Sequence, residues 1–204
     1  MINYYSLQIL NKIKQKKLSI GIIGLGYVGL KLLLQFANKK FKVYGFDNDS
    51  KKIKNLKKNK SPISYIANKD ISKINKFTKY YSDNYKQSKN CDVLIICLPT
   101  PLKKNKPDLS HIKNCMTEIQ KYLIKGQSII LESTTYPGTT EEVVVSKLKK
   151  FKIGENFFVG YSPEREDPGS KKFNFWNTPK IVSGYTENCQ SIVNNLYKKI
   201  LKKT

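Results

Sequence analysis

Mostly apolar runs of four to eight residues recur along the chain, at residues 18–23, 41–46, 91–98, 128–131 and 157–161. Runs of this length and composition are typical of parallel strands that are buried on both faces. In the intervals between them, apolar residues recur every three or four positions, as they do on one face of a helix. The pattern therefore predicts an α/β fold with a doubly wound, mostly parallel sheet.

Capping residues, turn residues and apolar spacing between these runs predict where the helices and the remaining strands lie. Ser110 is expected to cap a helix and Gly126 to end it. Two further strands are expected, one at residues 77–81 on an edge of the sheet and one within residues 177–183. The expected helices are residues 1–17, the segment that follows a turn at 24–29, residues 49–58 and 110–123, the segment from a turn at 136–138 to residue 148, and residues 187–201.

The turn after the first strand carries the pattern Gly-x-Gly-x-x-Gly between a strand and a helix. Gly24 permits a tight turn, Gly26 lets a pyrophosphate approach the backbone, and Gly29 lets the helix pack closely on the strand. The helix N-terminus offers free N–H groups and a positive dipole end to the phosphates. The second strand stops at Asp47, where a carboxylate can accept hydrogen bonds from both ribose hydroxyls. These features predict dinucleotide binding. NAD is favoured over NADP because the carboxylate repels a 2′-phosphate, although the lysine pair that follows softens that preference.

Polar clusters also follow three of the later strands, at residues 99–101, 132–134 and 162–169. Each cluster alone is more often an ordinary turn. In a doubly wound sheet, however, the ligand crevice lies beyond the carboxyl ends of the strands. Because five strand ends with polar or glycine-rich sequences meet at that edge, we expect a ligand crevice there.

The composition adds a strong positive charge to this picture. The 204 residues suffice for one full domain, and they carry 38 Lys and Arg against 15 Asp and Glu, a formal net charge of +23. Arg165 is the sole arginine, whereas base readout leans on arginine, and no nucleic-acid-binding signature occurs. We interpret the lysine excess as solvated surface and expect no specific nucleic-acid partner, with polyanion binding as the alternative.

Cysteine, histidine and hydropathy patterns exclude several kinds of site. Cys91, Cys97, Cys115 and Cys189 show neither metal-ligand spacing nor a disulfide framework, so we expect no metal and a cytoplasmic setting. The single histidine, His111, falls in the first turn of a predicted helix, as a surface residue rather than a catalytic base. No apolar run is long enough to span a bilayer, and the N-terminal stretch lacks a signal-peptide core. No membrane partner is therefore expected.

Four segments together resemble the N-terminal NAD-binding domain of the UDP-glucose/GDP-mannose dehydrogenase family. They are Gly24-Leu25-Gly26-Tyr27-Val28-Gly29-Leu30, Leu98-Pro99-Thr100-Pro101, Glu132-Ser133-Thr134, and the stretch from Tyr161 to Gly169. The last stretch looks most like UDP-N-acetylhexosamine enzymes, in particular UDP-N-acetylglucosamine 6-dehydrogenases. The resemblance implies a Rossmann-type domain at residues 18–204 behind an N-terminal helix at 1–17. It also implies oxidation of a UDP-sugar at C6 with two NAD, for surface polysaccharide synthesis.

The family's site residues carry over to this chain by position. The resemblance implies that Thr100 and Glu164 serve catalysis, Glu164 within a catalytic water network. Simpler but less favoured alternatives stay open for both residues, since Thr100 could cap a helix and Glu164 could form a local ion pair with Arg165. The implied cofactor residues are Gly24, Gly26, Tyr27, Val28 and Gly29 at the pyrophosphate, Asp47 and Lys52 at the ribose, and Thr100 and Thr134 at the nicotinamide, with Glu164 and Arg165 on the substrate side.

The resemblance also implies parts that these residues do not supply. Members of the family continue into a central helix and a UDP-binding domain with a cysteine nucleophile, and they form homo-oligomers. None of the four cysteines here lies in a glycine-rich turn followed by an acid. We therefore expect a half-enzyme that needs a separately encoded C-terminal half, with Leu196, Tyr197 and Ile200 exposed for docking onto the missing helix.

Two other functions remain open. One is a stand-alone NAD-binding module that regulates or scaffolds a partner. The other is a short relative of the 3-hydroxyacid or 6-phosphogluconate dehydrogenases, which the sequence of residues 162–169 disfavours.

Overall fold

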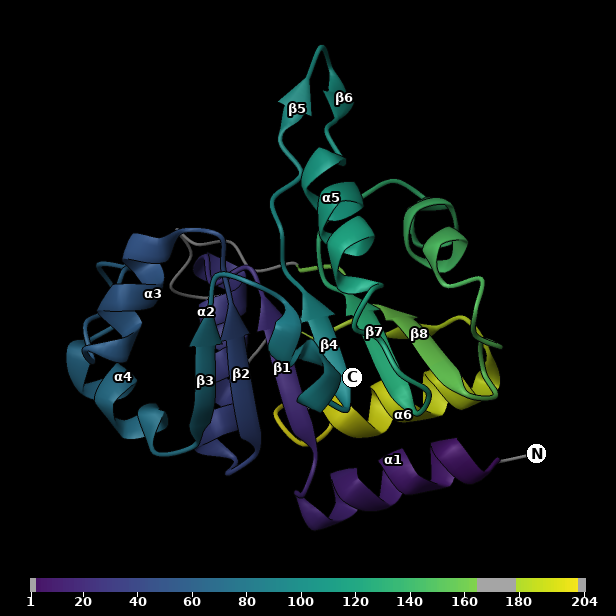
Figure 1. The fold of residues 1–204 in the computed structure, drawn as a ribbon, viewed down its shortest axis with the longest axis horizontal. Helices are drawn as coiled ribbons and strands as arrows, with labels where there is room; N and C mark the ends of the chain where they lie inside the picture. The colour runs from purple at the N-terminus through teal and green to yellow at the C-terminus, as the bar shows by residue number, and fades with distance from the viewer. Residues whose placement is uncertain (1–2, 165–178, 202–204) are drawn as a thin grey trace.

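A computed structural model describes residues 3–164 and 179–201 of the chain (Figure 1). Within these residues, seven strands form one sheet in the order β3-β2-β1-β4-β7-β8-β9, and all neighbours are parallel except β8 and β9. The strands are β1 (Ser19–Ile23), β2 (Lys42–Phe46), β3 (Thr78–Ser82), β4 (Val93–Ile96), β7 (Gln127–Leu131), β8 (Phe157–Tyr161) and β9 (Ser183–Gly184). This is the order of a doubly wound sheet with one antiparallel edge strand, so the predicted fold class is confirmed.

Helices cover both faces of the sheet (Figure 1). Buried side chains of α1, α2, α3, α4 and α6 belong to one core cluster, and those of α5 and η2 belong to a second. The helices are α1 (Tyr4–Gln15), α2 (Tyr27–Asn38), α3 (Ser50–Lys57), α4 (Asn68–Asn75), η1 (Lys86–Asn90), α5 (Ser110–Ile119), η2 (Thr140–Val144), η3 (Val145–Lys147) and α6 (Glu187–Tyr197). The sheet is therefore the middle of three layers.

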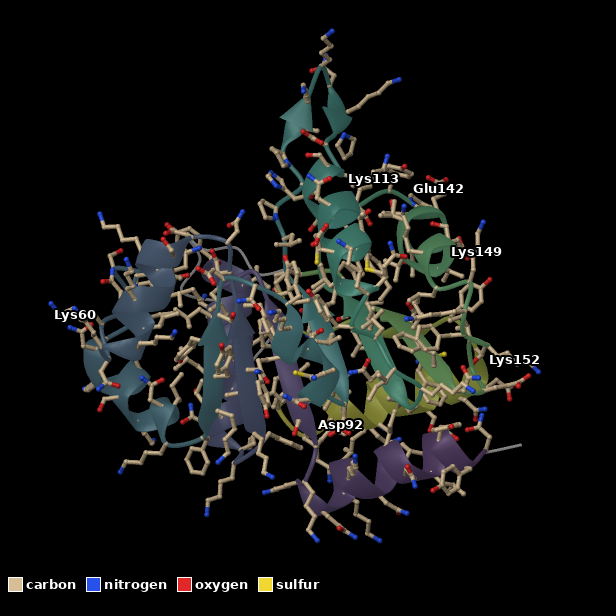
Figure 2. All side chains as sticks on the ribbon, in the orientation of Figure 1. Lys60, Asp92, Lys113, Glu142, Lys149 and Lys152 are labelled. Atoms are coloured by element: carbon tan, nitrogen blue, oxygen red, sulfur yellow. The ribbon has the colours of Figure 1, made fainter. Side chains whose placement is uncertain are left out.

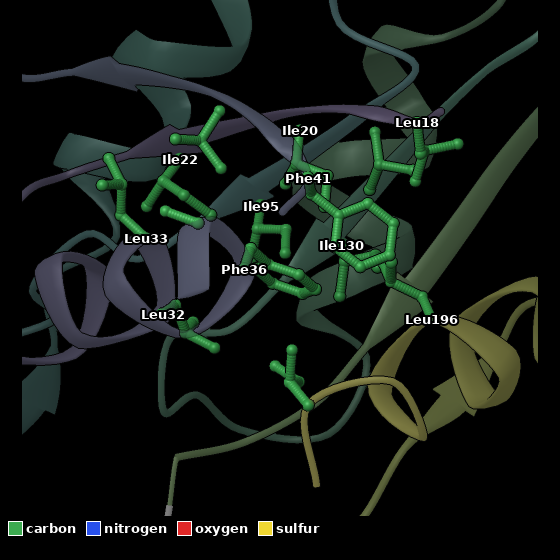
Figure 3. Packing of buried hydrophobic residues seen from close by; sticks show 14 of the residues in the cluster. Leu18, Ile20, Ile22, Leu32, Leu33, Phe36, Phe41, Ile95, Ile130 and Leu196 are labelled. Atoms are coloured by element: carbon green, nitrogen blue, oxygen red, sulfur yellow. The ribbon is translucent and has the colours of Figure 1, made fainter. Parts of the chain in front are cut away.

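The strands contribute side chains alternately to the two clusters. Ile95 of β4 lies in the first cluster, whereas its neighbour Ile96 lies in the second. Figure 3 shows the first cluster, in which Phe36 of α2 and Leu196 of α6 gather with Ile95 and Ile130 of the sheet. Phe36 is fully buried, and burial of such a side chain contributes roughly 1.5–3 kcal/mol. This packing fixes the strand ends that carry the polar clusters.

Helix α1 is fastened to the domain at both of its ends. Asn3 caps the helix and donates from Nδ2 to the Gly154 carbonyl (2.7 Å), which also accepts from Asn188 Nδ2 of α6 (3.0 Å). At the other end, Lys12 pairs with Asp92 (2.5 Å), whose second oxygen accepts from the Ser19 N–H (2.8 Å). The helix predicted within residues 1–17 is thus part of the packed structure.

Two predicted boundaries of α5 are wrong. The N-cap residue is Leu109, and it is Asp108 Oδ1 that accepts from the Ser110 N–H (2.9 Å), because an aspartate two residues upstream can form this local bond. The helix ends at Ile119 rather than at Gly126. Gly126 has a φ of +84° and instead shapes the turn into β7.

The segment after residues 136–138 is helical, although it is not an α-helix. It forms one π-helical turn, η2, and then one 3-10 turn, η3. The run Val143-Val144-Val145 explains the difference, since β-branched side chains disfavour the α-helix. The hairpin of β5 (Leu102–Lys103) and β6 (Lys106–Pro107), which projects from the molecule in Figure 1, was not predicted either.

The expected exposed docking surface on the last helix is also wrong. Leu196 and Tyr197 are fully buried and Ile200 is nearly so. These side chains belong to the first core cluster, because α6 packs against α1, β8 and β9. The apolar side of α6 is therefore already covered by this domain.

Lysines surround the molecule on its outer surface. Lys60, Lys149 and Lys152 are exposed and point away from the ribbon in Figure 2. Among the residues with described positions, no helix is both long and apolar enough to cross a membrane.

Candidate functional site

A cavity of about 620 Å³ lies at the carboxyl ends of β1, β2, β4 and β7. Backbone hydrogen bonds continue beyond the strands, from Cys97 N to Ile23 O (2.8 Å) and from Glu132 N to Ile96 O (2.8 Å). These bonds bring the glycine turn and the two later polar clusters side by side. Residues of the cavity wall include Gly24, Gly26, Tyr27, Val28, Asp47, Lys52, Thr100, Thr134 and Glu164.

Three glycines of the turn have different surroundings. Gly24 has a φ of +88°, and a Cβ atom there would lie 2.6 Å from the Cys97 carbonyl oxygen. A Cβ atom at Gly29 would lie 1.8 Å from the Gly24 carbonyl oxygen. At Gly26, by contrast, no atom lies within 4 Å of that position. Gly24 and Gly29 are therefore required by the fold. Gly26 leaves open space at the N-terminus of α2, where first-turn N–H groups lack intrahelical partners.

Asp47 connects the end of β2 to the glycine turn. Its Oδ2 accepts from the Leu25 N–H (2.7 Å) and from Lys52 Nζ (2.7 Å), and its Oδ1 accepts from the Asp49 N–H (3.0 Å). Only 6% of the Asp47 side chain is exposed. The sequence predicted Asp47 and Lys52 at one site. It did not predict that the Asp47 carboxylate also holds the glycine turn through the Leu25 N–H.

The loops after β4 and β7 are joined by side-chain hydrogen bonds. Thr100 Oγ1 donates to the Thr134 carbonyl (2.6 Å), and Ser133 Oγ donates to the Leu98 carbonyl (2.6 Å). The two threonines predicted at the nicotinamide therefore lie together. The Thr100 hydroxyl reaches the neighbouring strand end and caps no helix.

Glu132 forms a buried ion pair that sequence reasoning missed. It follows β7, its side chain is fully buried, and it pairs with Lys180 and accepts a hydrogen bond from the Tyr197 hydroxyl. Burial raises the pKa of Glu132 to about 7, although the Lys180 charge works in the opposite direction. Burial also raises the pKa of Tyr197 well above its usual value, and the charge of Glu132 adds to that increase. Nothing local in the sequence connects residues so far apart.

Glu164 lies at the cavity wall and is held by the same lysine. Its Oε2 lies 3.0 Å from Lys180 Nζ, and 15% of its side chain is exposed. Burial lowers the pKa of Lys180, but the charges of Glu132 and Glu164 outweigh burial, so that its pKa is raised overall. Arg165, which was expected beside Glu164, lies outside the described residues.

Another part of the cavity wall is formed by residues of α5 and of the segment before η1. They are Tyr85, His111, Asn114, Cys115 and Glu118. Burial raises the pKa of Cys115 to about 12 and the pKa of Tyr85 beyond its usual range. His111 is exposed in the first turn of α5, as predicted, and also borders the cavity. The sequence predicted a helix that starts at Ser110, shortly after the polar cluster at 99–101, and that helix forms this part of the wall.

The cavity offers the donors and acceptors that a dinucleotide needs. The open space at Gly26 adjoins the N-terminus of α2, as a pyrophosphate requires, and Asp47, at the end of the neighbouring strand, lines the same cavity. In the part of the chain that the structure describes, no three His, Cys, Asp or Glu side chains gather as they do around a metal ion. The groups that line the cavity are of the kinds that bind phosphates and sugar hydroxyls.

Comparisons with known proteins agree with this chemistry. Residues 18–201 match the model of the UDP-glucose/GDP-mannose dehydrogenase family, NAD binding domain. The chain is 38% identical over 187 residues to the protein CapL of Staphylococcus aureus. It is 36% identical over 190 residues to the UDP-N-acetyl-D-glucosamine 6-dehydrogenase of Pseudomonas aeruginosa. These alignments cover 90% and 91% of this chain, and 43% and 44% of the relatives.

A solved structure gives the same result. The NDP-N-acetyl-D-galactosaminuronic acid dehydrogenase of Methanosarcina mazei superposes with a TM-score of 0.84 at 28% identity, over 97% of this chain and 45% of that one. The chain thus spans less than half the length of the relatives it matches.

Proposed function

The chain belongs to the UDP-glucose/GDP-mannose dehydrogenase family, and from that premise we propose that it is the NAD-binding part of a UDP-N-acetylhexosamine 6-dehydrogenase. NAD is the cofactor of this domain. One observation carries the proposal: a single cavity joins the glycine turn and Asp47 to the threonine pair and Glu164. The domain division, with a helix at 1–17 in front of the cofactor domain, is part of the same proposal.

Different residues of the chain would bind different parts of the cofactor. The turn 24–29, with Tyr27 and Val28 in the first turn of α2, would hold the pyrophosphate through backbone N–H groups. Asp47 would accept from the ribose hydroxyls, with Lys52 fixing its carboxylate. When bound, the nicotinamide supplies the hydride acceptor for oxidation of an alcohol.

The nicotinamide would lie at the other end of the cavity. Thr100 and Thr134 would form its floor, since their hydrogen bond places both at the cavity wall. Glu164 would face the reacting carbon with its charged side chain and order the catalytic water. Arg165 is assigned to a phosphate by resemblance alone.

The substrate assignment rests on the stretch from Ser162 to Gly169 and on the names of relatives. Those names include a glucosamine and a galactosaminuronic acid enzyme, so the N-acetylhexosamine class is better supported than one particular sugar. We propose UDP-N-acetylglucosamine as the first substrate to test.

Three of the four cysteines are unsuited to the thioester chemistry that the family resemblance implies, and the fourth, Cys189, is buried beneath β8 with its Sγ accepting from the Val159 N–H. Burial raises the pKa of Cys91 and Cys115 strongly and that of Cys97 well above its usual value. A nucleophilic cysteine needs a lowered pKa or an adjacent base. We therefore propose that the 204 residues bind NAD without oxidising a nucleotide sugar on their own.

Calorimetric titration of the chain with NAD tests the cofactor assignment. We expect saturable binding. Asp47→Asn should weaken NAD about tenfold and narrow the preference over NADP, because a charge-assisted hydrogen bond of ~1.4 kcal/mol and the repulsion of a 2′-phosphate are lost. Asp70→Asn, in the exposed first turn of α4, is the matched control and should change neither affinity. Absence of binding at millimolar NAD by the folded chain would overturn the proposal.

A turnover assay tests the second half of the proposal. The chain with NAD and UDP-N-acetylglucosamine should form no NADH, and a separately expressed cysteine-bearing partner should restore turnover. Turnover by the chain alone would contradict the assignment of an incomplete site while leaving NAD binding intact. NAD binding without restoration by a partner would favour a stand-alone NAD-binding module.

A further inference from the structure

We propose that Lys180 is a positioning residue whose ammonium group holds the Glu164 carboxylate at the wall of the NAD cavity. The inference rests on the proposed function, in which Glu164 serves the reaction at the nicotinamide end. Lys180 lies three residues before β9, outside the four segments that carry the family resemblance. Its role therefore follows from its contacts.

The contacts of Lys180 come from the ends of two strands, β7 and β8. Its Nζ pairs with Glu132 Oε1 after β7, lies 3.0 Å from Glu164 Oε2 after β8, and lies 3.5 Å from the Pro163 carbonyl. An ammonium group has three N–H donors and no acceptor. Glu164 Oε2 and the Pro163 carbonyl accept hydrogen bonds from this group, and Glu132 Oε1 is its second ionic partner. This arrangement suits a group that holds another residue, rather than one that binds substrate.

The exposure of these side chains increases toward the cavity. The Glu132 side chain is fully buried, Lys180 is 6% exposed, and Glu164 is 15% exposed. A buried ammonium requires a paired carboxylate, and Glu132 already meets that need. The second carboxylate, Glu164, is the member that borders the cavity. Its attachment to Lys180 therefore orients a cavity residue, beyond what stability of the buried pair requires.

A second bond fixes the same stretch of backbone. Ser162 Oγ donates to the Ile181 carbonyl (2.9 Å), one residue from Lys180. Residues 162–164 are thus held twice by residues 180 and 181, once through the Ser162 hydroxyl and once through the Glu164 side chain. Glu132 accepts a hydrogen bond from the Tyr197 hydroxyl of α6, and its ion pair with Lys180 fixes the position of the lysine on the buried side. These contacts hold Glu164 where it borders the cavity.

Glutamate-selective carbon-13 labelling of the 204-residue chain tests this role without any cofactor. We would measure the order parameter of the Glu164 side chain and the titration of Glu132 by NMR in Lys180→Met, which removes the charge and keeps much of the volume. Lys180→Arg keeps the charge, and Lys152→Met is the matched control because Lys152 pairs with Glu155 at an exposed surface site. Glu132→Gln and Glu164→Gln assign the signals.

In Lys180→Met, we expect the Glu164 order parameter to fall below ~0.6, the range of flexible groups. We also expect the Glu132 midpoint to rise by at least about one pH unit, because the Lys180 charge that lowers its pKa is gone. Burial and the Glu164 charge still raise that pKa, the Tyr197 hydroxyl still lowers it through its hydrogen bond, and Cys97 also faces the carboxyl group. Lys180→Arg should restore the order of Glu164, and Lys152→Met should change neither quantity. A Glu164 side chain as rigid in Lys180→Met as in the unchanged chain would overturn the proposal.

If Lys180→Met does not fold, the double variant Glu132→Gln/Lys180→Met carries the test, since it removes both charges of the buried pair. Compared with Glu132→Gln alone, it should release Glu164, and equal order in the two variants would overturn the assignment.

NAD affinity separates this inference from the proposed function. Lys180→Met should bind NAD within about threefold of the unchanged chain, which is less than 1 kcal/mol. A loss as large as that of Asp47→Asn would make Lys180 a cofactor contact and would overturn the positioning role. If the unchanged chain binds no NAD, the proposed function fails, while the NMR comparison still decides whether Lys180 holds Glu164.

Discussion

At the scale of single residues, the site contains two carboxylates in different surroundings. Asp47 accepts two backbone N–H groups and one ammonium, and it borders the cavity. Glu132 is fully buried, with Lys180 and the Tyr197 hydroxyl as partners. Burial has raised the pKa of Glu132 to about 7, because the neighbouring ammonium offsets only part of the desolvation. The first acid is arranged to meet a ligand and the second to hold a structure.

The raised pKa of Glu132 predicts a pH-dependent stability. Between the unfolded value of 4.5 and the folded value of about 7, the folded chain binds one more proton than the unfolded chain, so this group's contribution is fully present below pH 4.5 and is lost as the pH rises through 7. Its loss is on the order of 3 kcal/mol for a shift of this size. Glu132→Gln should lack this decrease. Urea unfolding at about pH 5 and about pH 8 measures it.

Glu155→Gln is the matched control for this experiment, because Glu155 is largely exposed. It should keep the pH dependence of the unchanged chain. If the free energy of unfolding changes equally with pH in Glu132→Gln and in the unchanged chain, Glu132 has the same pKa in the folded and unfolded states, and the prediction is wrong.

At the scale of elements, the turn between β1 and α2 combines a requirement of the fold with a requirement of the ligand. Gly29 permits the close approach of α2 to the Gly24 carbonyl, whereas Gly26 borders empty space. Helix α2 begins at Tyr27, so its N-terminus is aimed at the cavity. The same motif thus contains positions that differ in what they control.

Alanine substitutions should separate these two requirements. Gly26→Ala should change the free energy of unfolding by less than ~1 kcal/mol and weaken NAD by about tenfold or more, because its methyl group enters the space of the pyrophosphate. Gly29→Ala should lower stability by ~3 kcal/mol or more, because a methyl group cannot share space with a carbonyl oxygen. Urea unfolding and calorimetry of each variant provide the measurements. Equal stability of the two variants would contradict the assignment.

Local patterns were sufficient for the elements whose sequence and environment agree. The segment from β1 to β2 was predicted correctly because its glycines, apolar runs and terminal acid each follow from local geometry. A helix after residues 136–138 was also predicted, but its π and 3-10 form was not, and neither was the hairpin of β5 and β6. The hairpin depends on positive φ angles at Lys104 and Asn105, which the sequence does not indicate.

At the scale of the whole molecule, the parallel sheet gathers distant residues at one edge. That edge was predictable, because strand ends must meet there. The partners Lys180 and Tyr197 were not, since an ion pair between residues 132 and 180 leaves no trace in local spacing. Tyr197 was even assigned to an exposed surface, because helix periodicity identifies an apolar face without saying what covers it.

The net charge of +23 is also a property of the whole molecule. Self-repulsion among lysines destabilises a compact chain, and salt screens that repulsion. Raising sodium chloride from low to moderate concentration should therefore raise the thermal midpoint by ~2–4 °C, the shift that ~1 kcal/mol produces in a chain of this size. Differential scanning calorimetry measures the midpoint, and potassium chloride at equal ionic strength should act equally. A midpoint that falls with salt would show that attractive pairs dominate.

The hydrogen bond from the Leu25 N–H to Asp47 Oδ2 has a consequence for how the cofactor is sensed. In the proposed function, a ribose hydroxyl that competes for this oxygen would also displace the glycine turn. We therefore expect the adenosine and diphosphate parts of NAD to bind interdependently, so that a fragment such as AMP changes the conformation of the turn before the rest of the cofactor binds.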